Sequence, residues 1–420
     1  MPPRKKRKSA PALTVVSAPD HISALPDSML HHVLSFLPVQ AAVRTCVLAR
    51  RWRHLWRSTT GLRIVGFDDK KHLQHLRNFM HHLLVLRERT DLDTVEIKLG
   101  VFVEEDQTHV NLWTRFAVMC RARALTLHVN GPLRLDMDDL PLVSRHLRTL
   151  DLHDVDLPKS FIDFAGCPAL EGLKMNLCSV SVGRISSCSL RHLSITGCHF
   201  GLGRWVIVSA PGLVSLTLKL VGLSDTKTPC LESMASLETA RVYLGLNCAD
   251  VCLNYDDYGH FCGANDKACN NCVPIKDDGS GDAVLLGGIS GAKHLELRSQ
   301  PRKFIFARDL KHCPTFSKLK SLLLNEYWCE APGLDPLLCI LKNSPVLEKL
   351  TLQLFSVGPN NKLHLKGSYK SMERPSAISR HLNIVEVKCD VVEERIYKVI
   401  KLLCAALNIR EQTNDTFHAL

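Results

Sequence analysis

The hexapeptide Leu147-Arg-Thr-Leu150-Asp-Leu152 places apolar residues at its first, fourth and sixth positions. The same pattern recurs along most of the chain, with starts at Leu92, Ala122, Leu147, Leu170, Leu190, Leu213, Leu237, Ala292, Leu319, Leu347 and Leu382. Successive starts are 20 to 30 residues apart, except for two gaps of 55 and 35 residues. A repeat of this length supplies one short strand and one return segment, so stacked repeats bury a continuous core. The pattern therefore predicts a solenoid of parallel strands.

The period and the pattern are those of a leucine-rich repeat. Cys178 and Cys198 each stand eight residues after a repeat start, where the repeat consensus has Asn or Cys, so we expect structural roles for both thiols. An ordinary α/β domain with Leu-rich strands would explain single units but not their recurrence. We therefore predict an irregular α/β leucine-rich-repeat array over residues 61–375, in which parallel strands alternate with helices and loops.

Side chains between the buried positions of each strand should line the concave face of this solenoid. These positions hold six cations and four anions, which is not the one-sided basic surface that a phosphate backbone requires. The array is therefore predicted to bind a target protein of unknown identity, and nucleic acid is disfavoured. The candidate target-binding residues are His153, Lys174, Asn176, Lys219, Arg241, Tyr243, Arg298 and Asn325.

Upstream of the array, apolar residues follow a helical period between residues 25 and 37. Pro26 suits the first turn of a helix, and Pro38 would end it. Two further short helices are indicated over residues 41–47 and 48–56. Three short helices in about 40 residues cannot bury all their large apolar side chains, and each one left exposed forgoes about 1.5–3 kcal/mol relative to burial. This surplus predicts docking to a partner.

This helical block, residues 19–60, resembles an F-box. The matching positions are Leu25-Pro26, Leu30, Leu34, Leu37-Pro38, Val43, Val47-Leu48 and Arg51-Trp52-Arg53-x-Leu55-Trp56. Cys46 is one departure from the family pattern, because many relatives carry Ser or Thr at this position. The resemblance implies binding to the Skp-type adaptor of a cullin-RING ubiquitin ligase. The adaptor-binding residues that it implies are Leu25, Pro26, Leu30, Leu34, Leu37, Pro38, Val43, Leu48, Trp52 and Trp56, of which the two tryptophans would chiefly anchor the third helix.

The carboxyl-terminal segment reads as a strand over residues 383–388 followed by an amphipathic helix over residues 391–407. Such a unit would cover the exposed hydrophobic end of a solenoid. The segment 376–412 resembles the C-terminal module of plant F-box proteins of the FBD type, and residues 413–420 would form a short tail. The overall likeness is to a plant F-box/leucine-rich-repeat protein of the FBD type, which gives the expected fold of a small three-helix F-box, a repeat solenoid and a strand-helix cap.

The net charge of +11 is concentrated at the amino terminus, where Arg4, Lys5, Lys6, Arg7 and Lys8 contribute five positive charges. We expect residues 1–18 to form a disordered basic tail. The basic block resembles a nuclear import signal that an import receptor would bind, although a merely solvated tail is the alternative. We expect no secretory signal and no membrane span, and the localisation predicted is the nucleus, with the cytosol as a second compartment.

The gap of 55 residues contains a cysteine-rich insertion at about residues 248–282. Cys269-Asn-Asn-Cys272 has the spacing of half a zinc site, but the other half is poorly matched, so a surface loop with reduced thiols is favoured. We therefore predict no metal and no cofactor, with Cys269 and Cys272 as the candidate ligands for the zinc alternative. The 17 cysteines are read as mostly buried free thiols of a reducing compartment.

No phosphate-binding loop, zinc-protease helix or dinucleotide fingerprint occurs in the sequence, and no RING-type Cys/His array. The chain is therefore predicted not to be an enzyme. We expect a substrate-recognition subunit of an SCF-type ubiquitin ligase, joined to cullin and RING subunits through the adaptor and acting by proximity. The alternatives are a repeat scaffold that acts without the ligase and a nuclear nucleic-acid-associated factor.

Overall fold

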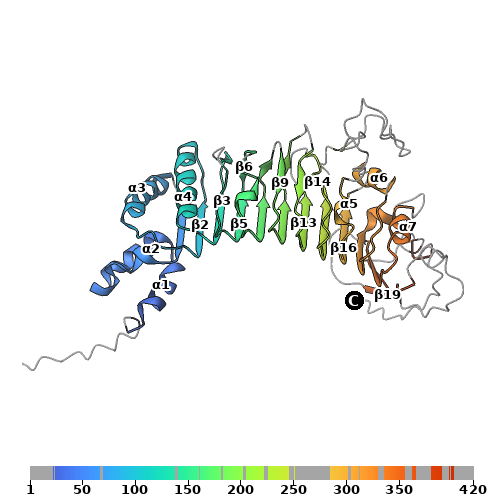
Figure 1. The fold of residues 1–420 in the computed structure, drawn as a ribbon, viewed down its shortest axis with the longest axis horizontal. Helices are drawn as coiled ribbons and strands as arrows, with labels where there is room; N and C mark the ends of the chain where they lie inside the picture. The colour runs from blue at the N-terminus through green and yellow to red at the C-terminus, as the bar shows by residue number, and fades with distance from the viewer. Residues whose placement is uncertain are drawn as a thin grey trace, which may run out of the picture.

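A computed structural model gives the fold of the chain. It describes residues 22, 24–66, 70–137, 141–159, 161–180, 183–201, 205–221, 226–245, 250, 284–300, 304–311, 313–329, 335–354, 362–365, 380–389, 397 and 399–401. Figure 1 shows an elongated body in which strands lie side by side between a helical N-terminal end and a helical C-terminal end. Within the described ranges, no helix is both long and apolar enough to cross a membrane.

One sheet runs the length of the body and contains thirteen strands among the described residues. In spatial order they are β1 (Gly61–Gly66), β2 (Thr94–Leu99), β3 (Ala124–Val129), β5 (Thr149–His153), β7 (Gly172–Asn176), β10 (His192–Thr196), β13 (Ser215–Leu220), β15 (Thr239–Leu244), β16 (His294–Ser299), β17 (Ser321–Asn325), β18 (Lys349–Gln353), β20 (Ile384–Lys388) and β19 (Lys362–Leu365). Neighbouring strands pair in parallel, except that β19 is antiparallel to β20. The predicted order of a small helical N-terminal module followed by an open array of mainly parallel strands is confirmed.

Each of the repeat starts found in the sequence lies two residues before a strand of this sheet. The repeat search missed β1, which lies first in the sheet and pairs with β2. Its start position is occupied by Thr59 instead of an apolar residue. The buried Thr59 hydroxyl lies 3.3 Å from the Trp56 carbonyl oxygen and 3.2 Å from the Gly61 carbonyl oxygen, so a hydrogen-bonding side chain replaces the usual leucine.

The return segments differ with repeat length. The long first and last repeats carry helices, namely α3 (Lys70–Leu86), η4 (Glu104–Asp106), α4 (Gln107–Met119), α5 (Leu286–Ile289), α6 (Phe304–Lys311), η6 (Glu326–Cys329) and α7 (Asp335–Lys342). The short central repeats carry η5 (Phe164–Gly166) and two narrow sheets. The first sheet consists of β4 (Leu135–Asp136), β6 (Val155–Leu157), β8 (Ser179–Val180) and β11 (His199–Phe200). The second consists of β9 (Arg184–Ser186), β12 (Ile207–Ser209) and β14 (Cys230–Leu231). A repeat of 20 to 25 residues has too few residues for a strand, two turns and a helix of three turns.

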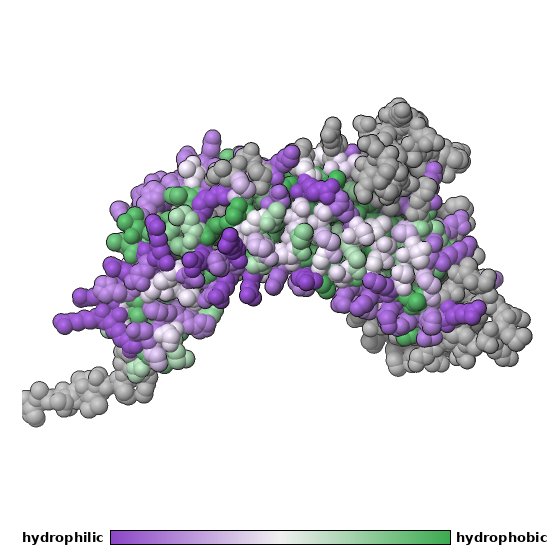
Figure 2. Space-filling model, in the orientation of Figure 1, coloured by the Kyte–Doolittle hydropathy of each residue, from purple (hydrophilic) through white to green (hydrophobic). Residues whose placement is uncertain are grey.

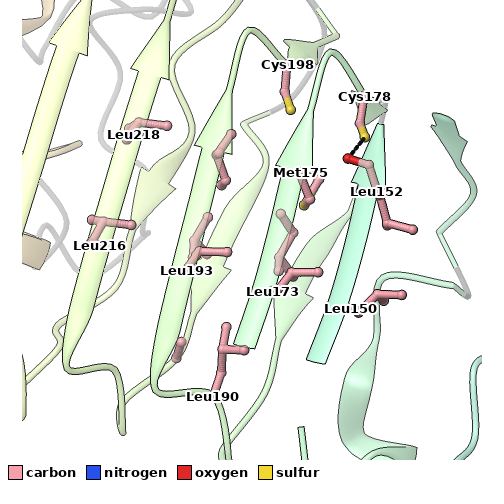
Figure 3. Close-up of a cluster of buried hydrophobic side chains, with 14 of the residues drawn as sticks. Leu150, Leu152, Leu173, Met175, Cys178, Leu190, Leu193, Cys198, Leu216 and Leu218 are labelled. Atoms are coloured by element: carbon pink, nitrogen blue, oxygen red, sulfur yellow. Dashed lines mark hydrogen bonds between the residues drawn. The ribbon is translucent and has the colours of Figure 1, made fainter. Parts of the chain in front are cut away.

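Leucines at equivalent positions of neighbouring strands form the core of the array (Figure 3). Cys178 and Cys198 follow β7 and β10 and are both buried. The Cys178 thiol donates to the Leu152 carbonyl oxygen of the preceding repeat at 3.5 Å. Contact with Cys178 and burial raise the pKa of Cys198 well above its usual value, so this thiol stays protonated.

The N-terminal module consists of α1 (Asp27–Ser35), α2 (Val39–Arg44) and three 3-10 turns, η1 (Thr45–Val47), η2 (Arg50–Arg53) and η3 (Leu55–Ser58). The predicted third helix is therefore two 3-10 turns separated by His54 and preceded by an extended Ala49. Trp52 in η2 and Leu55 at the start of η3 are both buried.

Candidate functional site

The interior of the N-terminal module contains four of the predicted adaptor contacts. Leu30 and Leu34 are 0% and 1% exposed, and Trp52 and Trp56 are also buried. Leu30 and Leu34 are one helical turn apart on α1, and α1 packs against η3 and β1. The burial of Leu30 and Leu34 corrects their assignment as exposed adaptor contacts, because both side chains face the interior of the module. Trp52 and Trp56 were expected chiefly to anchor the third helix, and they are buried as well.

A second apolar row on the module is exposed. Met29, Val33 and Phe36 lie on α1 and at its end, and Phe36 is 59% exposed. Val47, 83% exposed, and Leu48 lie in and after η1, and the exposed Ile22 precedes α1. We call these six residues, Ile22, Met29, Val33, Phe36, Val47 and Leu48, the apolar row.

Of the apolar row, only Leu48 was among the predicted adaptor contacts. The other predicted contacts have partial or full exposure: Pro26 is exposed, and Leu25, Leu37, Pro38 and Val43 are partly buried. The signal that could have found the row is a second helical stripe. One stripe, on α1 and just after it, consists of Leu30, Leu34 and Leu37, and the exposed stripe consists of the residues just before them, Met29, Val33 and Phe36. Because successive residues of an α-helix are rotated by about 100°, the two stripes lie about 100° apart around α1.

Hydrogen bonds fix the N-terminal module on the first two strands of the array. The Arg63 guanidinium on β1 donates to the Phe36 carbonyl oxygen at 2.6 Å and to the Glu96 carboxylate on β2 at 2.5 Å. Gly61, at the start of β1, lies so close to α1 that an added Cβ atom would stand 2.5 Å from the Ser35 carbonyl oxygen. The apolar row is therefore held in a fixed orientation relative to the repeats.

Glu96 on β2 provides a pH test of this junction. Burial raises its pKa, but hydrogen bonds from Lys98 and Arg63 outweigh burial, and the net pKa lies below the ordinary value of 4.5. A depressed pKa adds stability above the ordinary pKa, and this stability is lost as pH falls through the folded-state pKa. We expect the stability advantage of the wild type over Glu96→Gln to shrink between pH 6 and pH 3, as measured by thermal unfolding. An advantage that is unchanged at pH 3 would contradict the assignment.

On the repeat face, every candidate target-binding residue directly follows a buried position of its strand. The register aligns one row through Lys174 and Arg241 and a second through His153, Asn176, Lys219, Tyr243, Arg298 and Asn325. The residues are not gathered at one place, because His153 lies on β5 and Asn325 on β17.

His153 lies in a separate part of the face, away from the other candidates on β13 to β17. Its ring centroid is 5.5 Å from that of His128, and the His128 Nε2 atom is 3.3 Å from an Asp151 carboxylate oxygen. Burial and the neighbouring His128 lower the pKa of His153. His153 is therefore expected to be neutral at pH 7, and it adds no positive charge to the face.

Several predicted features fall on residues outside the described ranges. These are the basic block Arg4, Lys5, Lys6, Arg7 and Lys8, the pair Cys269 and Cys272, and most of the proposed cap. The described part of the cap comprises β20, with Tyr397, Val399, Ile400 and Lys401 in helical conformation. Within the described residues, no group of three His, Cys, Asp or Glu side chains is placed to hold a metal ion.

Comparison with known proteins matches both parts of the chain. Residues 22–62 match the F-box domain family, and residues 87–240 match the family described as FBD-associated F-box protein At5g56370, LRR repeats. F-box/FBD/LRR-repeat protein At5g22700 of Arabidopsis thaliana is 27% identical over 375 residues, which cover 80% of this chain and 79% of that protein. MEIOTIC F-BOX protein MOF of Oryza sativa subsp. japonica is 28% identical over 365 residues, which cover 79% of this chain and 71% of that protein.

These matches agree with the order of elements in the structure, in which the helical module precedes the parallel strands. The F-box match ends at Leu62, within β1, and the repeat match runs from Arg87 to β15. The recognition made from the sequence is thereby confirmed: the chain matches the F-box family and the FBD-associated repeat family, and it is similar over most of its length to plant F-box/FBD/LRR-repeat proteins.

Proposed function

We propose that this protein is the substrate-recognition subunit of an SCF-type cullin-RING ubiquitin ligase. F-box domains generally bind Skp-type adaptors, and the adaptor would link the chain to the cullin and RING subunits. The repeats would bind a target protein and hold its lysines near the conjugating enzyme. The chain itself would supply position, not chemistry.

The observation that carries this proposal is the apolar row. Six large apolar side chains stand exposed on a module of about 40 residues, although the same module buries Leu30, Leu34, Trp52 and Trp56 completely or almost so. Covering one such side chain with a partner contributes about 1.5–3 kcal/mol. Several large apolar side chains exposed on one small module favour a binding role.

The row is also preorganised for binding. The Arg51 guanidinium donates to the Asp27 carboxylate at 2.9 Å and ties η2 to the start of α1. The His32 ring packs edge-on against Phe36 with centroids 4.9 Å apart. Side chains that are already ordered lose less entropy on association, so more of the burial energy appears as affinity.

The basic block at residues 4–8 fits the same proposal if the ligase acts in the nucleus. Five consecutive cations offer an import receptor a dense positive segment. Deletion of residues 1–18 is expected to move the protein from the nucleus to the cytosol in fluorescence imaging of living cells, while adaptor capture is retained. A nuclear distribution that survives the deletion would contradict the import assignment.

The test of adaptor binding compares Val33→Glu with Val85→Glu. Both valines are exposed and lie in the last turn of a helix, α1 and α3 respectively, so the two substitutions carry the same helix penalty. We expect Val33→Glu to weaken binding of the purified Skp-type adaptor at least about tenfold, because a charge replaces an apolar contact. Val85→Glu should bind as the wild type does, as measured by biolayer interferometry.

Two results would count against the proposal. Equal adaptor binding by Val33→Glu and the wild type would remove the apolar row from the interface. Failure of the wild-type chain to bind the adaptor at all would favour the ligase-independent repeat scaffold. Circular dichroism on both variants separates a lost contact from an unfolded module.

A further inference from the structure

The charge of the repeat face is unevenly distributed. The positions four and six residues after each repeat start hold six cations and four anions. Away from β13 to β16, each cation has a carboxylate on its own or the adjacent strand: Lys98 with Glu96, Lys174 with Asp151, and Lys388 with Glu386. Glu96 is shared by Arg63 and Lys98, and Glu386 by Lys349 and Lys388. The excess of cations is largest on β13, β15 and β16, where Lys219, Arg241 and Arg298 face a single strand carboxylate, Glu296.

A pocket of about 460 Å³ opens at these strands. Its lining extends from Lys219 on β13 to Gln353 on β18, and it includes Arg241, Tyr243 and Arg298. Neighbouring strands are about 4.8 Å apart, so the lining spans about 20 Å across the sheet. Pockets that bind ligands commonly enclose about 300–1,000 Å³. This pocket therefore has room for several side chains of an extended segment.

The groups on the cationic side of the pocket are hydrogen-bond donors. Lys and Arg side chains donate and cannot accept. The Tyr243 oxygen already accepts a hydrogen bond from the Gln300 amide at 3.1 Å, so its own O–H remains able to donate to a ligand. Among the described residues, Lys219 forms no ion pair. A ligand placed here must supply acceptors, and a negatively charged acceptor is favoured.

Two internal contacts hold the pocket in shape. Glu296 lies 3.4 Å from the Arg241 Nε atom and 2.7 Å from the Arg298 Nε atom, so both guanidinium groups share this one carboxylate. The Asn325 amide accepts from the Ser299 backbone N–H at 3.0 Å and donates to the Ser299 carbonyl oxygen at 2.7 Å. Each guanidinium has five donors, and one shared carboxylate leaves most of them for a ligand.

The far side of the pocket is different. Gln353 contributes an amide, and Glu326 adds a second carboxylate at that rim. The pocket is thus positive over β13 to β16 and polar or negative over β17 and β18. An anionic group would be attracted to the first part and repelled from the second, which gives a bound segment a defined direction.

We infer that this pocket binds an acidic stretch of the target protein, with one carboxylate or phosphate group over Lys219, Arg241 and Arg298. The inference rests on the proposed function, because the bound stretch would be the recognition segment of the ubiquitination target. It narrows the candidate target-binding residues to those on β13 to β17 and leaves His153, Lys174 and Asn176 outside the pocket.

The test uses the full chain in complex with the purified adaptor. A random peptide display library is selected on this complex, and the enriched peptides are resynthesised for affinity measurements by fluorescence anisotropy. We expect enrichment of Asp and Glu. Lys219→Glu should weaken the selected peptides at least about tenfold, because it replaces a charge-assisted contact with repulsion. Replacing one peptide Glu with phosphoserine distinguishes a carboxylate preference from a phosphate preference.

Lys174→Glu is the matched control, since Lys174 is an exposed lysine on the same sheet face at β7. It should leave peptide affinity unchanged. The inference is overturned if selection gives no binder or binders without acidic residues, if Lys219→Glu binds as the wild type does, or if Lys174→Glu causes the same loss. Competition by duplex DNA that depends on Lys219 would instead identify a nucleic-acid surface. Adaptor capture by each variant is measured in parallel, so failure of the pocket is separated from failure of the ligase proposal.

Discussion

Asp309→Ala is expected to lower the free energy of unfolding by about 4 kcal/mol, because it leaves three buried N–H groups without an acceptor. Asp309 lies on α6 and has no exposed surface. Its carboxylate accepts hydrogen bonds from the backbone N–H groups of Val284, Leu285 and Leu286 at 2.8, 2.7 and 2.8 Å. These groups begin the segment that leads into α5, so one side chain connects two neighbouring repeats.

Urea unfolding followed by circular dichroism measures this loss. Asp309→Asn keeps one acceptor oxygen and should fall between the wild type and Asp309→Ala. Lys342→Ala, an exposed position on α7, should change the free energy of unfolding by less than about 0.5 kcal/mol. A loss below about 1 kcal/mol for Asp309→Ala would show that water or another group satisfies these N–H groups.

Arg87→Ala is expected to lower the free energy of unfolding by about 3 kcal/mol and to loosen the F-box from the array. Arg87 follows α3 and is 5% exposed. One of its terminal nitrogens donates to the Trp56 carbonyl oxygen at 3.3 Å and to the Thr59 hydroxyl at 3.0 Å, and the other donates to the Thr59 carbonyl oxygen. Burial lowers the pKa of Arg87 to about 10.

Two measurements test the expected effects of Arg87→Ala. Denaturant unfolding gives the stability, and limited proteolysis reports cleavage between residues 57 and 62, where the F-box meets β1. Arg87→Lys keeps the charge but not the planar fork, so it should lose most of the same stability. Arg89→Ala, at an exposed position two residues later, is the control and should resemble the wild type. Unchanged proteolysis in Arg87→Ala would mean that the junction does not depend on this guanidinium.

The repeat pattern predicted the sheet well because the same physical requirement acts in every repeat. Each strand must bury alternate side chains against its neighbours, so leucines recur at fixed offsets and set the register from Thr94 to Lys388. β1 was not predicted, because a buried threonine can take the place of a leucine when its hydroxyl finds backbone acceptors. Such a substitution carries no hydrophobic signal in the sequence.

The adaptor surface was harder to predict from the sequence than the sheet. Residues 29 to 37 contain two apolar stripes on one short helix, and periodicity alone does not say which stripe faces inward. Contacts of α1 with β1 and η3 determine which stripe is buried, because they cover Leu30 and Leu34 and leave Met29 and Val33 exposed. The choice therefore depends on contacts with segments distant in the sequence.

The pocket on the repeat face was only partly predictable, for a related reason. The sequence identifies the charged residues on the face, but their pairing depends on which strands are neighbours. Arg241 on β15 and Glu296 on β16 lie on adjacent strands, although a gap of 55 residues separates the starts of their two repeats. Only the strand order shows that three cations and one strand carboxylate lie together between β13 and β16.

Hydrogen exchange measured by mass spectrometry, with and without the purified Skp-type adaptor, tests adaptor docking most directly. The apolar row predicts slower exchange in peptides that cover residues 27–36 and 45–48 when the adaptor is bound, because docking stabilises α1 and η1. Peptides from α3 and from the sheet should exchange as before. Unchanged exchange over residues 27–36 together with protection elsewhere would contradict the account.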